Sequence, residues 1–353
     1  MNPPQVASSG SAVTSSYTEL ARTVRESGLM ARRYGYYWTY LAAALGGVAA
    51  LLATMVWLGN SWFQLLVAAV LGCLLAQFGF LGHDAAHRQI FRSASWNEWT
   101  ARLLSAVVIG LSYGWWREKH SRHHARPNQL GRDPDVASGV FAMTAAAAAE
   151  RHGLRGWMAR HQGWLLFPLL AFEGLNLQVA GVRRLLVTRE RHRLLELALV
   201  LTRISGFVAL LLVLLPTGKA AAFFAIQAAV FGLILGGSFV PNHIGMPIVP
   251  KEAQLDFLHR QVLMSRNVTG GILVETALGG LNHQIEHHLF PSMPRPNLKR
   301  VRPVVREYCA ARGVRYTEMG LVASYVAAVG HLNNVGLRAA TPFDCPLASQ
   351  LRG

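Results

Sequence analysis

Four apolar stretches limit the folds open to this chain of 353 residues. They lie at residues 37–58, 62–81, 197–215 and 220–240. Roughly 20 apolar residues in a helix span the hydrocarbon core of a bilayer. Lipid offers the backbone no hydrogen-bond partners, so each stretch must form a helix. Charged residues make up 15% of the chain, against about a quarter in soluble proteins. The sequence therefore predicts an all-α integral membrane protein.

Short loops join these stretches in pairs, at residues 59–61 and 216–219. Connections of this length favour antiparallel helices, so the spans are expected to form two hairpins. Two weaker apolar stretches, residues 103–116 and 164–179, are too short or too interrupted to cross a bilayer. They are predicted to be re-entrant or interfacial helices.

Basic residues are distributed unevenly around the spans. The chain has 34 Lys and Arg against 18 Asp and Glu. If both tight loops lie outside, Lys219 is the only external base, and Arg203 lies near the inner end of the third span, from which it can reach the interface. The positive-inside rule then places both termini and the middle region in the cytoplasm. Because the bases lie between apolar runs, lipid head groups rather than nucleic acid are the expected partners.

The cysteines and the termini carry little sign of a site. Cys73, Cys309 and Cys345 form no Cys-x-x-Cys motif, which argues against a thiolate metal site and fits a reducing cytoplasm. The N-terminus has no hydrophobic core of a signal peptide. Residues 1–27 are predicted to be a mobile cytoplasmic tail, residues 28–340 one membrane domain, and residues 341–353 a C-terminal tail.

Eight of the 14 histidines fall into three clusters that follow apolar stretches. Histidines three or four residues apart on a helix point in similar directions and can share a metal. Two surface histidines are the plainer interpretation of the first cluster, whereas three histidines within five residues rarely serve packing. The clusters consist of His83 and His87; His120, His123 and His124; and His283, His287 and His288.

The third cluster allows two registers. Gln284 with His287 and His288 repeats the spacing of the second cluster, whereas His283 with His287 repeats that of the first. Adjacent helical residues lie roughly 100° apart, so His283 and Gln284 compete for one role. A ninth histidine, His243, follows the fourth span at the same membrane edge. Neighbouring polar residues are expected to hydrogen-bond the imidazoles; they are Asp84, Asn242 and Glu286.

The donor set narrows the choice of metal. Many imidazoles, no thiolates and few carboxylates exclude iron–sulfur clusters and disfavour calcium and magnesium. A zinc site needs only about four ligands, so eight or nine histidines suit two metal ions. Iron that handles O₂ is the natural match beside lipid.

The order and spacing of the three clusters, around two membrane hairpins, resemble those of the membrane fatty acid desaturases. Residues 279–291 read GGLNHQIEHHLFP, similar to the third histidine box of the linoleoyl-CoA or front-end branch, and Gly82-His83-Asp84 resembles the first box. The resemblance runs from residue 37 to 336. It implies four spans and a cytoplasmic helical cap that holds two irons. The implied ligands are His83, His87, His120, His123, His124, His243, His287 and His288, with Gln284 or His283 at the remaining position.

The resemblance also implies a reaction. O₂ and two electrons at the irons would introduce a cis double bond into an acyl chain carried by CoA, acyl-carrier protein or a lipid. Front-end relatives in eukaryotes carry a fused cytochrome b-type domain marked His-Pro-Gly-Gly, which this sequence lacks. A separate donor, such as a ferredoxin with its reductase, is therefore expected, and the enzyme is expected in a bacterial cytoplasmic membrane.

Two other classes of protein share some of these features. A related di-iron hydroxylase or acetylenase, acting on alkyl or isoprenoid chains, would use the same ligands. A metal transporter or haem-binding membrane protein would place histidines inside the spans, along a path. Here the clusters flank the spans, which argues against transport.

Overall fold

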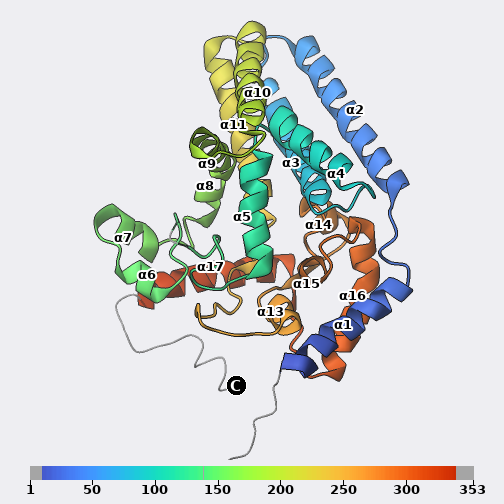
Figure 1. Cartoon of the computed structure of the whole chain (residues 1–353). Helices are drawn as coiled ribbons and strands as arrows, with labels where there is room; N and C mark the ends of the chain where they lie inside the picture. Colours follow the sequence, from blue (N-terminus) through green and yellow to red (C-terminus); the bar gives the residue numbers. More distant parts are fainter. Residues whose placement is uncertain (1–9, 138, 339–353) are drawn as a thin grey trace, which may run out of the picture.

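The computed structural model describes residues 10–338 apart from residue 138, with side chains from 17 to 337. Four long helices carry the apolar stretches: α2 (Tyr34–Leu58), α3 (Gln64–Ala86), α10 (Arg193–Leu214) and α11 (Thr217–Gly237) (Figure 1). The short helix α12 (Val240–His243) extends the apolar run of α11. Each run is long and apolar enough to cross a membrane, with mean hydropathy between 2.0 and 2.4. The four predicted spanning helices are confirmed.

The turns of the two helical pairs lie at one end of the molecule (Figure 1). The Lys219 ammonium, at the start of α11, donates to the backbone and side-chain oxygens of Asn60, both at 2.7 Å. It also lies 5.0 Å from the centre of the Trp62 ring. Lys219, the only base predicted to lie outside, therefore links the turn before α11 to the turn between α2 and α3.

Helices α3 and α11 form the inner pair and α2 and α10 the outer pair. About half of the apolar stretch of α3 and 44% of that of α11 are buried, against 11% for α2 and for α10. Gly72 lets the inner helices approach, because a Cβ there would lie 2.8 Å from the Gln227 carbonyl of α11. Small residues at such crossings are usual where lipid supplies no hydrophobic driving force. The outer helices leave large apolar side chains exposed, as lipid contact requires.

The stretch predicted as one short helix at residues 103–116 is divided in the structure. Helix α4 (Ala94–Leu103) passes into a π-helix (Leu104–Ile109), and α5 (Tyr113–Ala125) begins after a turn at Gly110, whose φ is +75°. The turn leaves carbonyls without helical partners. Arg203 donates to the Val108 carbonyl at 2.7 Å and Gln178 to the Ile109 carbonyl at 3.2 Å. Arg203 thus binds this turn as well as lying in the third span.

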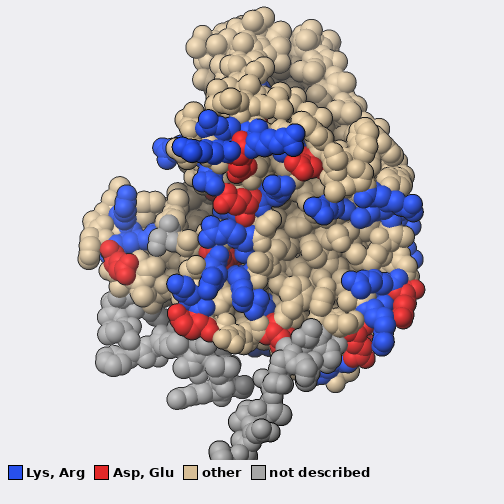
Figure 2. Space-filling model, viewed as in Figure 1, with Lys and Arg blue, Asp and Glu red and all other residues tan. Residues whose placement is uncertain are grey.

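The remaining elements surround the other end of the long helices. Two strands pair in parallel, with Asn267 opposite Glu318. Charged residues gather in this half, while the half that holds the helical turns is almost entirely uncharged in Figure 2. These elements are α6 (Ala145–Ala149), α7 (Gly153–Arg160), α8 (Leu166–Leu170), α9 (Glu173–Val187), α13 (Phe257–Leu263), β1 (Asn267–Thr269), α14 (Ile272–Ala277), α15 (Gln284–Leu289), α16 (Arg295–Ala311), β2 (Glu318–Gly320) and α17 (Leu321–Arg338).

The N-terminal segment differs from the predicted mobile tail. Residues Gly10–Glu26 form helix α1, and Leu20 and Val24 are buried against α13 and α16 (Figure 1). Tyr17 donates to the Leu289 carbonyl at 2.8 Å. Apolar residues four apart gave this segment a helical face that composition alone concealed. Residues 1–9 and the predicted C-terminal tail, residues 341–353, lie outside the described residues.

Candidate metal centre

Eight histidines from four distant segments meet where the long helices reach the charged half. His83 lies in the last turn of α3, and His87 directly follows that helix. Helix α5 carries three more, α12 ends at His243, and α15 carries the last two. Their ring nitrogens form two adjacent groups, and within each group the nitrogens lie within 4.8 Å of one another. The first group is His83, His87, His120, His124 and His287; the second is His123, His243 and His288.

Consecutive histidines enter different groups. His123 and His124 are adjacent on α5, yet they belong to the second and the first group, and His287 and His288 divide in the same way. Neighbouring helical residues point roughly 100° apart, so each of these two helices serves both groups. The two groups are therefore held side by side by shared backbone, as a two-metal centre requires.

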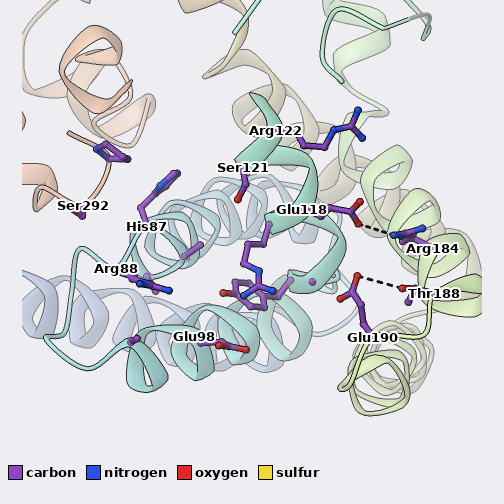
Figure 3. Close-up of a pocket in the computed structure, with 17 residues that line it drawn as sticks. His87, Arg88, Glu98, Glu118, Ser121, Arg122, Arg184, Thr188, Glu190 and Ser292 are labelled. Atoms are coloured by element: carbon purple, nitrogen blue, oxygen red, sulfur yellow. Dashed lines mark hydrogen bonds and ion pairs between the residues drawn. The ribbon is translucent and has the colours of Figure 1, made fainter. Parts of the chain in front are cut away.

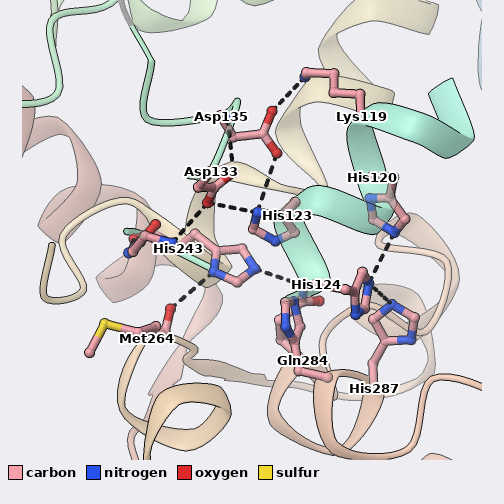
Figure 4. A network of polar contacts seen from close by, with 12 residues as sticks. Lys119, His120, His123, His124, Asp133, Asp135, His243, Met264, Gln284 and His287 are labelled. Atoms are coloured by element: carbon pink, nitrogen blue, oxygen red, sulfur yellow. Dashed lines mark hydrogen bonds and ion pairs between the residues drawn. The ribbon is translucent and has the colours of Figure 1, made fainter. Parts of the chain in front are cut away.

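Ring nitrogens in the first group lie at the spacing of ligands on a shared ion. The Nε2 atoms of His87 and His120 are 2.9 Å apart, those of His120 and His124 3.0 Å, and those of His124 and His287 3.1 Å. Two imidazole nitrogens bound about 2.1 Å from one metal, at a right angle, are about 3 Å apart. Figure 4 shows His120, His124 and His287 turned toward one another.

In the second group, every Nδ1 atom has a hydrogen-bond acceptor. That of His123 faces the Asp133 carboxylate at 2.9 Å and that of His243 the Met264 carbonyl at 3.0 Å (Figure 4). That of His288 faces the Gln261 side-chain oxygen at 2.9 Å. An acceptor at Nδ1 holds the proton there and leaves the Nε2 lone pair for a metal.

The buried Nε2 atoms of His83, His123 and His288 have no hydrogen-bond partner within the described part of the chain. Buried polar atoms without partners are costly and are uncommon in folded proteins. One metal ion in each group would satisfy all three, His83 in the first group and His123 and His288 in the second. A donor set of imidazoles suits iron, zinc, copper or nickel. These residues therefore fit a pair of transition-metal ions.

Electrostatics keep most of these imidazoles neutral, as ligands must be. Burial, reinforced by the neighbouring histidines, holds the pKa values of four first-group members well below the ordinary value, and the same holds for His288. The affected first-group members are His87, His120, His124 and His287. His123 is the exception. Burial lowers its pKa, but the hydrogen bond and charge of Asp133 outweigh burial and raise it.

Four groups that bind the histidines were not singled out from the sequence. Asp133 is buried and accepts from the His123 ring, and Asp135 lies 3.4 Å from the same nitrogen while it pairs with Lys119 at 2.5 Å. The Gln261 side chain and the Met264 carbonyl hold His288 and His243. The pair of acids around Pro134, nine residues after the second cluster, was an available signal. No sequence pattern pointed to Gln261 or Met264.

The three residues predicted to hydrogen-bond the histidines have different surroundings. Asp84 lies 3.5 Å from the His83 ring and forms a buried ion pair with Arg295 at 2.7 Å. The Asn242 amide donates to the Gln284 side-chain oxygen at 3.4 Å. Glu286 faces away from both groups: it accepts from Asn267 at 2.7 Å and from Tyr316 at 2.5 Å. Burial raises the Glu286 pKa to about 6.

The two competing residues of the third cluster are also separated. The Gln284 side-chain nitrogen lies 2.8 Å from Nε2 of His243, on the side of the second group. His283 lies outside both groups, with its Nε2 atom 3.4 Å from the Asn282 amide. The position of Gln284 favours it over His283 for a role at the centre.

A buried carboxylate anchors the helix that serves both groups. Glu196, at the start of α10, accepts from the Ser112 hydroxyl at 2.8 Å and from the Gly114 amide at 3.1 Å, both at the first turn of α5. Arg102 of α4 pairs with the same carboxylate at 3.0 Å. Anionic groups stabilise helix N-termini, whose amides lack partners. Glu196 therefore fixes where α5 begins and so where its histidines lie.

A polar cavity of about 850 Å³ reaches the first group, with His87 in its wall (Figure 3). It lies between α4, α5 and α9 and contains the ion pair of Arg184 with Glu118, at 2.9 Å. Both signs of charge line it. The charged lining residues are Arg88, Glu98, Arg117, Glu118, Arg122, Arg184 and Glu190. The centre is thus open to a polar molecule on one side.

Fold and site together define a protein with two adjacent histidine groups that could each hold a metal ion, built on four helices long and apolar enough to span a membrane. Comparison with known proteins identifies the family: the fatty acid desaturase model matches residues 60–320, which include every histidine of both groups. The chain belongs to the fatty acid desaturase family.

Curated relatives have the same family name. An acyl-lipid (9-3)-desaturase of Physcomitrium patens is 31% identical over 317 residues, which cover 86% of this chain and 59% of the relative. Fatty acid desaturase 3 of Bos taurus is 30% identical and covers 79% of this chain and 63% of its own length. The delta(5) fatty acid desaturase fat-4 of Caenorhabditis elegans is 28% identical, with 86% and 70% covered. The chain thus spans about three fifths of the length of the first two.

Proposed function

We propose that this protein is a membrane fatty acyl desaturase with two irons held by the two histidine groups. One observation carries the proposal: eight histidines from four segments converge as two adjacent groups at the end of the spanning helices. Family membership and the names of the relatives support it. The proposed ligands are His83, His87, His120, His124 and His287 for one iron, and His123, His243 and His288 with Gln284 for the other.

The reaction takes two hydrogens from neighbouring CH₂ groups of an acyl chain. With O₂, two electrons and two protons, it gives a cis double bond and two molecules of water. Methylene C–H bonds are inert, and the irons would supply the oxidising power from O₂. The chain's own residues bind and orient. Asp133, Met264 and Gln261 keep three imidazoles in the tautomer that ligates.

The expected partners follow from the surroundings of the site. The cavity beside His87 would receive the polar end of an acyl-CoA, an acyl-carrier protein or a lipid, with Arg88 and Arg122 available to its phosphate. The net charge of +16 suits an acidic electron donor, such as a ferredoxin served by a reductase. We place the protein in a bacterial cytoplasmic membrane, with the histidine groups and both termini in the cytoplasm.

A related hydroxylase or acetylenase would share the metal centre and differ only in the product. The chain can be expressed in a host that lacks membrane desaturases, hydroxylases and acetylenases of this family. Profiling of the fatty acid methyl esters then separates these three activities. We expect a new cis double bond, located by mass spectrometry. A new hydroxyl or triple bond would support the alternative.

Two variants link any product to the centre. His123→Ala removes a proposed ligand and is expected to abolish the product while the protein remains in the membrane. His152→Ala changes an exposed histidine at the start of α7, outside both groups, and should leave the product unchanged. Product formed by the His123 variant at the wild-type rate would contradict the ligand assignment.

A further inference from the structure

Arg266 is buried without a carboxylate partner close to the second histidine group. Its side chain is 2% exposed and is one of the largest fully buried side chains in the structure. No carboxylate of the described residues lies within ion-pair distance of its guanidinium. Burial lowers its pKa to about 10, still far above neutral pH, so the group stays charged. A buried unpaired cation is costly and needs a compensating role.

Two donors of the Arg266 guanidinium go to backbone carbonyls on either side of His243, while Nη2 also lies 3.4 Å from the Ser324 carbonyl and Nη1 lies 3.7 Å from the Met319 sulfur. The Arg266 Nε atom donates to the Pro241 carbonyl at 2.7 Å, and its Nη2 atom to the Ile244 carbonyl at 3.0 Å. Its own backbone amide donates to the Asn242 carbonyl at 2.8 Å. The carbonyl of His243 itself accepts from the Asn128 amide at 3.2 Å.

Four consecutive carbonyls, at residues 241–244, are therefore all bound, three of them by Arg266. They end α12, where a helix leaves carbonyls without partners. A four-residue helix has little stability of its own. Helix α12 continues the apolar run of α11, and these outside donors fix its free end and so the direction in which His243 points.

The segment that contains Arg266 also binds the imidazole. The Met264 carbonyl, two residues before Arg266, accepts from Nδ1 of His243 at 3.0 Å. Backbone and ring of His243 are thus both fixed by residues 264–266. Within the second group, only His243 has no other histidine of the centre on its own helix. The hydrogen bonds from residues 264–266 therefore position His243 in place of a neighbouring ligand on the same helix.

We propose that Arg266 is a positioning residue that holds the Nε2 atom of His243 toward the second metal ion. The proposal rests on the two-metal function proposed above. A lysine cannot replace the arginine, because its single nitrogen cannot reach carbonyls on both sides of His243 at once as the planar fork does.

Anaerobic titration of the metal-depleted, full-length protein with Fe²⁺ tests this role without turnover. The wild-type chain is expected to bind two equivalents tightly. In Arg266→Lys, one equivalent should bind about 10- to 100-fold more weakly, the usual cost of losing a group that supports a ligand, while the other is unchanged. Arg300→Met, which removes an exposed arginine on α16, is the control and should bind both equivalents like wild type.

A double-mutant cycle separates a role through His243 from a general structural role. If Arg266 acts through His243, the double variant Arg266→Lys/His243→Gln should bind iron no more weakly than His243→Gln alone. Additive losses, equal weakening of both equivalents, or two wild-type equivalents in Arg266→Lys would each overturn the proposal. So would Arg266 variants that fail to accumulate in membranes where His243→Gln accumulates. A wild-type chain that binds no iron would instead overturn the proposed function, and this inference with it.

Discussion

At the scale of single residues, the centre depends on acceptors that decide which imidazole nitrogen is free. His123, His243 and His288 use three kinds of acceptor, a carboxylate, a carbonyl and an amide oxygen, for the same purpose. The histidines themselves were evident from their spacing. Their acceptors were not, because Gln261 and Met264 lie far from the clusters in sequence and become neighbours only through folding.

Asp133→Asn tests the carboxylate that binds His123. An amide of the same shape lacks the charge and can present its NH₂ group to the ring, which favours the wrong tautomer. We expect iron to bind about 10- to 100-fold more weakly, with the same loss in product formation. The iron that each variant retains is measured by metal analysis after dialysis against a chelator. Glu150→Gln, at an exposed position, is the control, and equal metal retention in the two variants would argue against the assignment.

His331 gives a pH prediction away from the centre. Burial lowers its pKa, with a smaller contribution from the charge of Arg266, and its Nε2 atom has no hydrogen-bond partner in the described structure. The folded state resists the proton that the unfolded state accepts near pH 6.5, so stability present above that pH is lost as pH falls. His331→Gln should therefore show a smaller drop in Tm between pH 7.5 and pH 5.5, measured in detergent. If the Tm of His331→Gln fell as far as that of the wild type over this pH range, the prediction would be contradicted.

At the scale of secondary structure, length and hydropathy were sufficient for the spanning helices, and capping and packing decided the rest. The apolar stretches were found within a few residues of their observed ends. The division of residues 94–125 into α4, a π-helix and α5 was not predicted, since it depends on Arg203 and Gln178 binding freed carbonyls across the fold. The helix over Gly10–Glu26 was missed because its apolar face has a partner only in α13 and α16.

Gly279 tests how the third histidine cluster is packed against α3. Its φ is +59°, and a Cβ there would lie 2.1 Å from the ring of Phe80. Gly279→Ala should cost about 1–2 kcal/mol for the left-handed backbone and about 1–3 kcal/mol for overpacking. A lower Tm and weaker metal retention should result. Gly271→Ala, where a Cβ has open space and φ is negative, should change neither. Equal effects of the two changes would show that close packing at Gly279 is unimportant.

At the scale of the whole molecule, charge and apolar surface lie in separate halves. The half that holds the helical turns carries almost no charge, and charged residues gather in the other half (Figure 2). This division agrees with a protein whose apolar half lies in a membrane and whose charged half lies at the membrane surface.

Cysteine labelling tests the proposed orientation. In a chain whose three native cysteines are replaced, Glu150→Cys should react with an impermeant maleimide in inside-out vesicles, and Asn60→Cys only after detergent is added. Both positions are exposed, at opposite ends of the structure. Labelling of both cysteines from one side would contradict the topology.

The sequence by itself determined that the chain is helical with four stretches apolar enough to span a membrane, that its histidines form clusters with the spacing of metal ligands, and which family it resembles. These properties depend on local composition and spacing. The tertiary structure alone decided that His123 and His124 enter different groups, that Gln284 rather than His283 approaches His243, that Asp133 accepts from the His123 ring, and that Arg266 binds a carbonyl beside His243. The physical reason is that a ring's direction and its hydrogen-bond partner depend on contacts with other segments, from 10 residues away for His123 and Asp133 to 163 residues away for His287 and His124, and no local pattern encodes that packing.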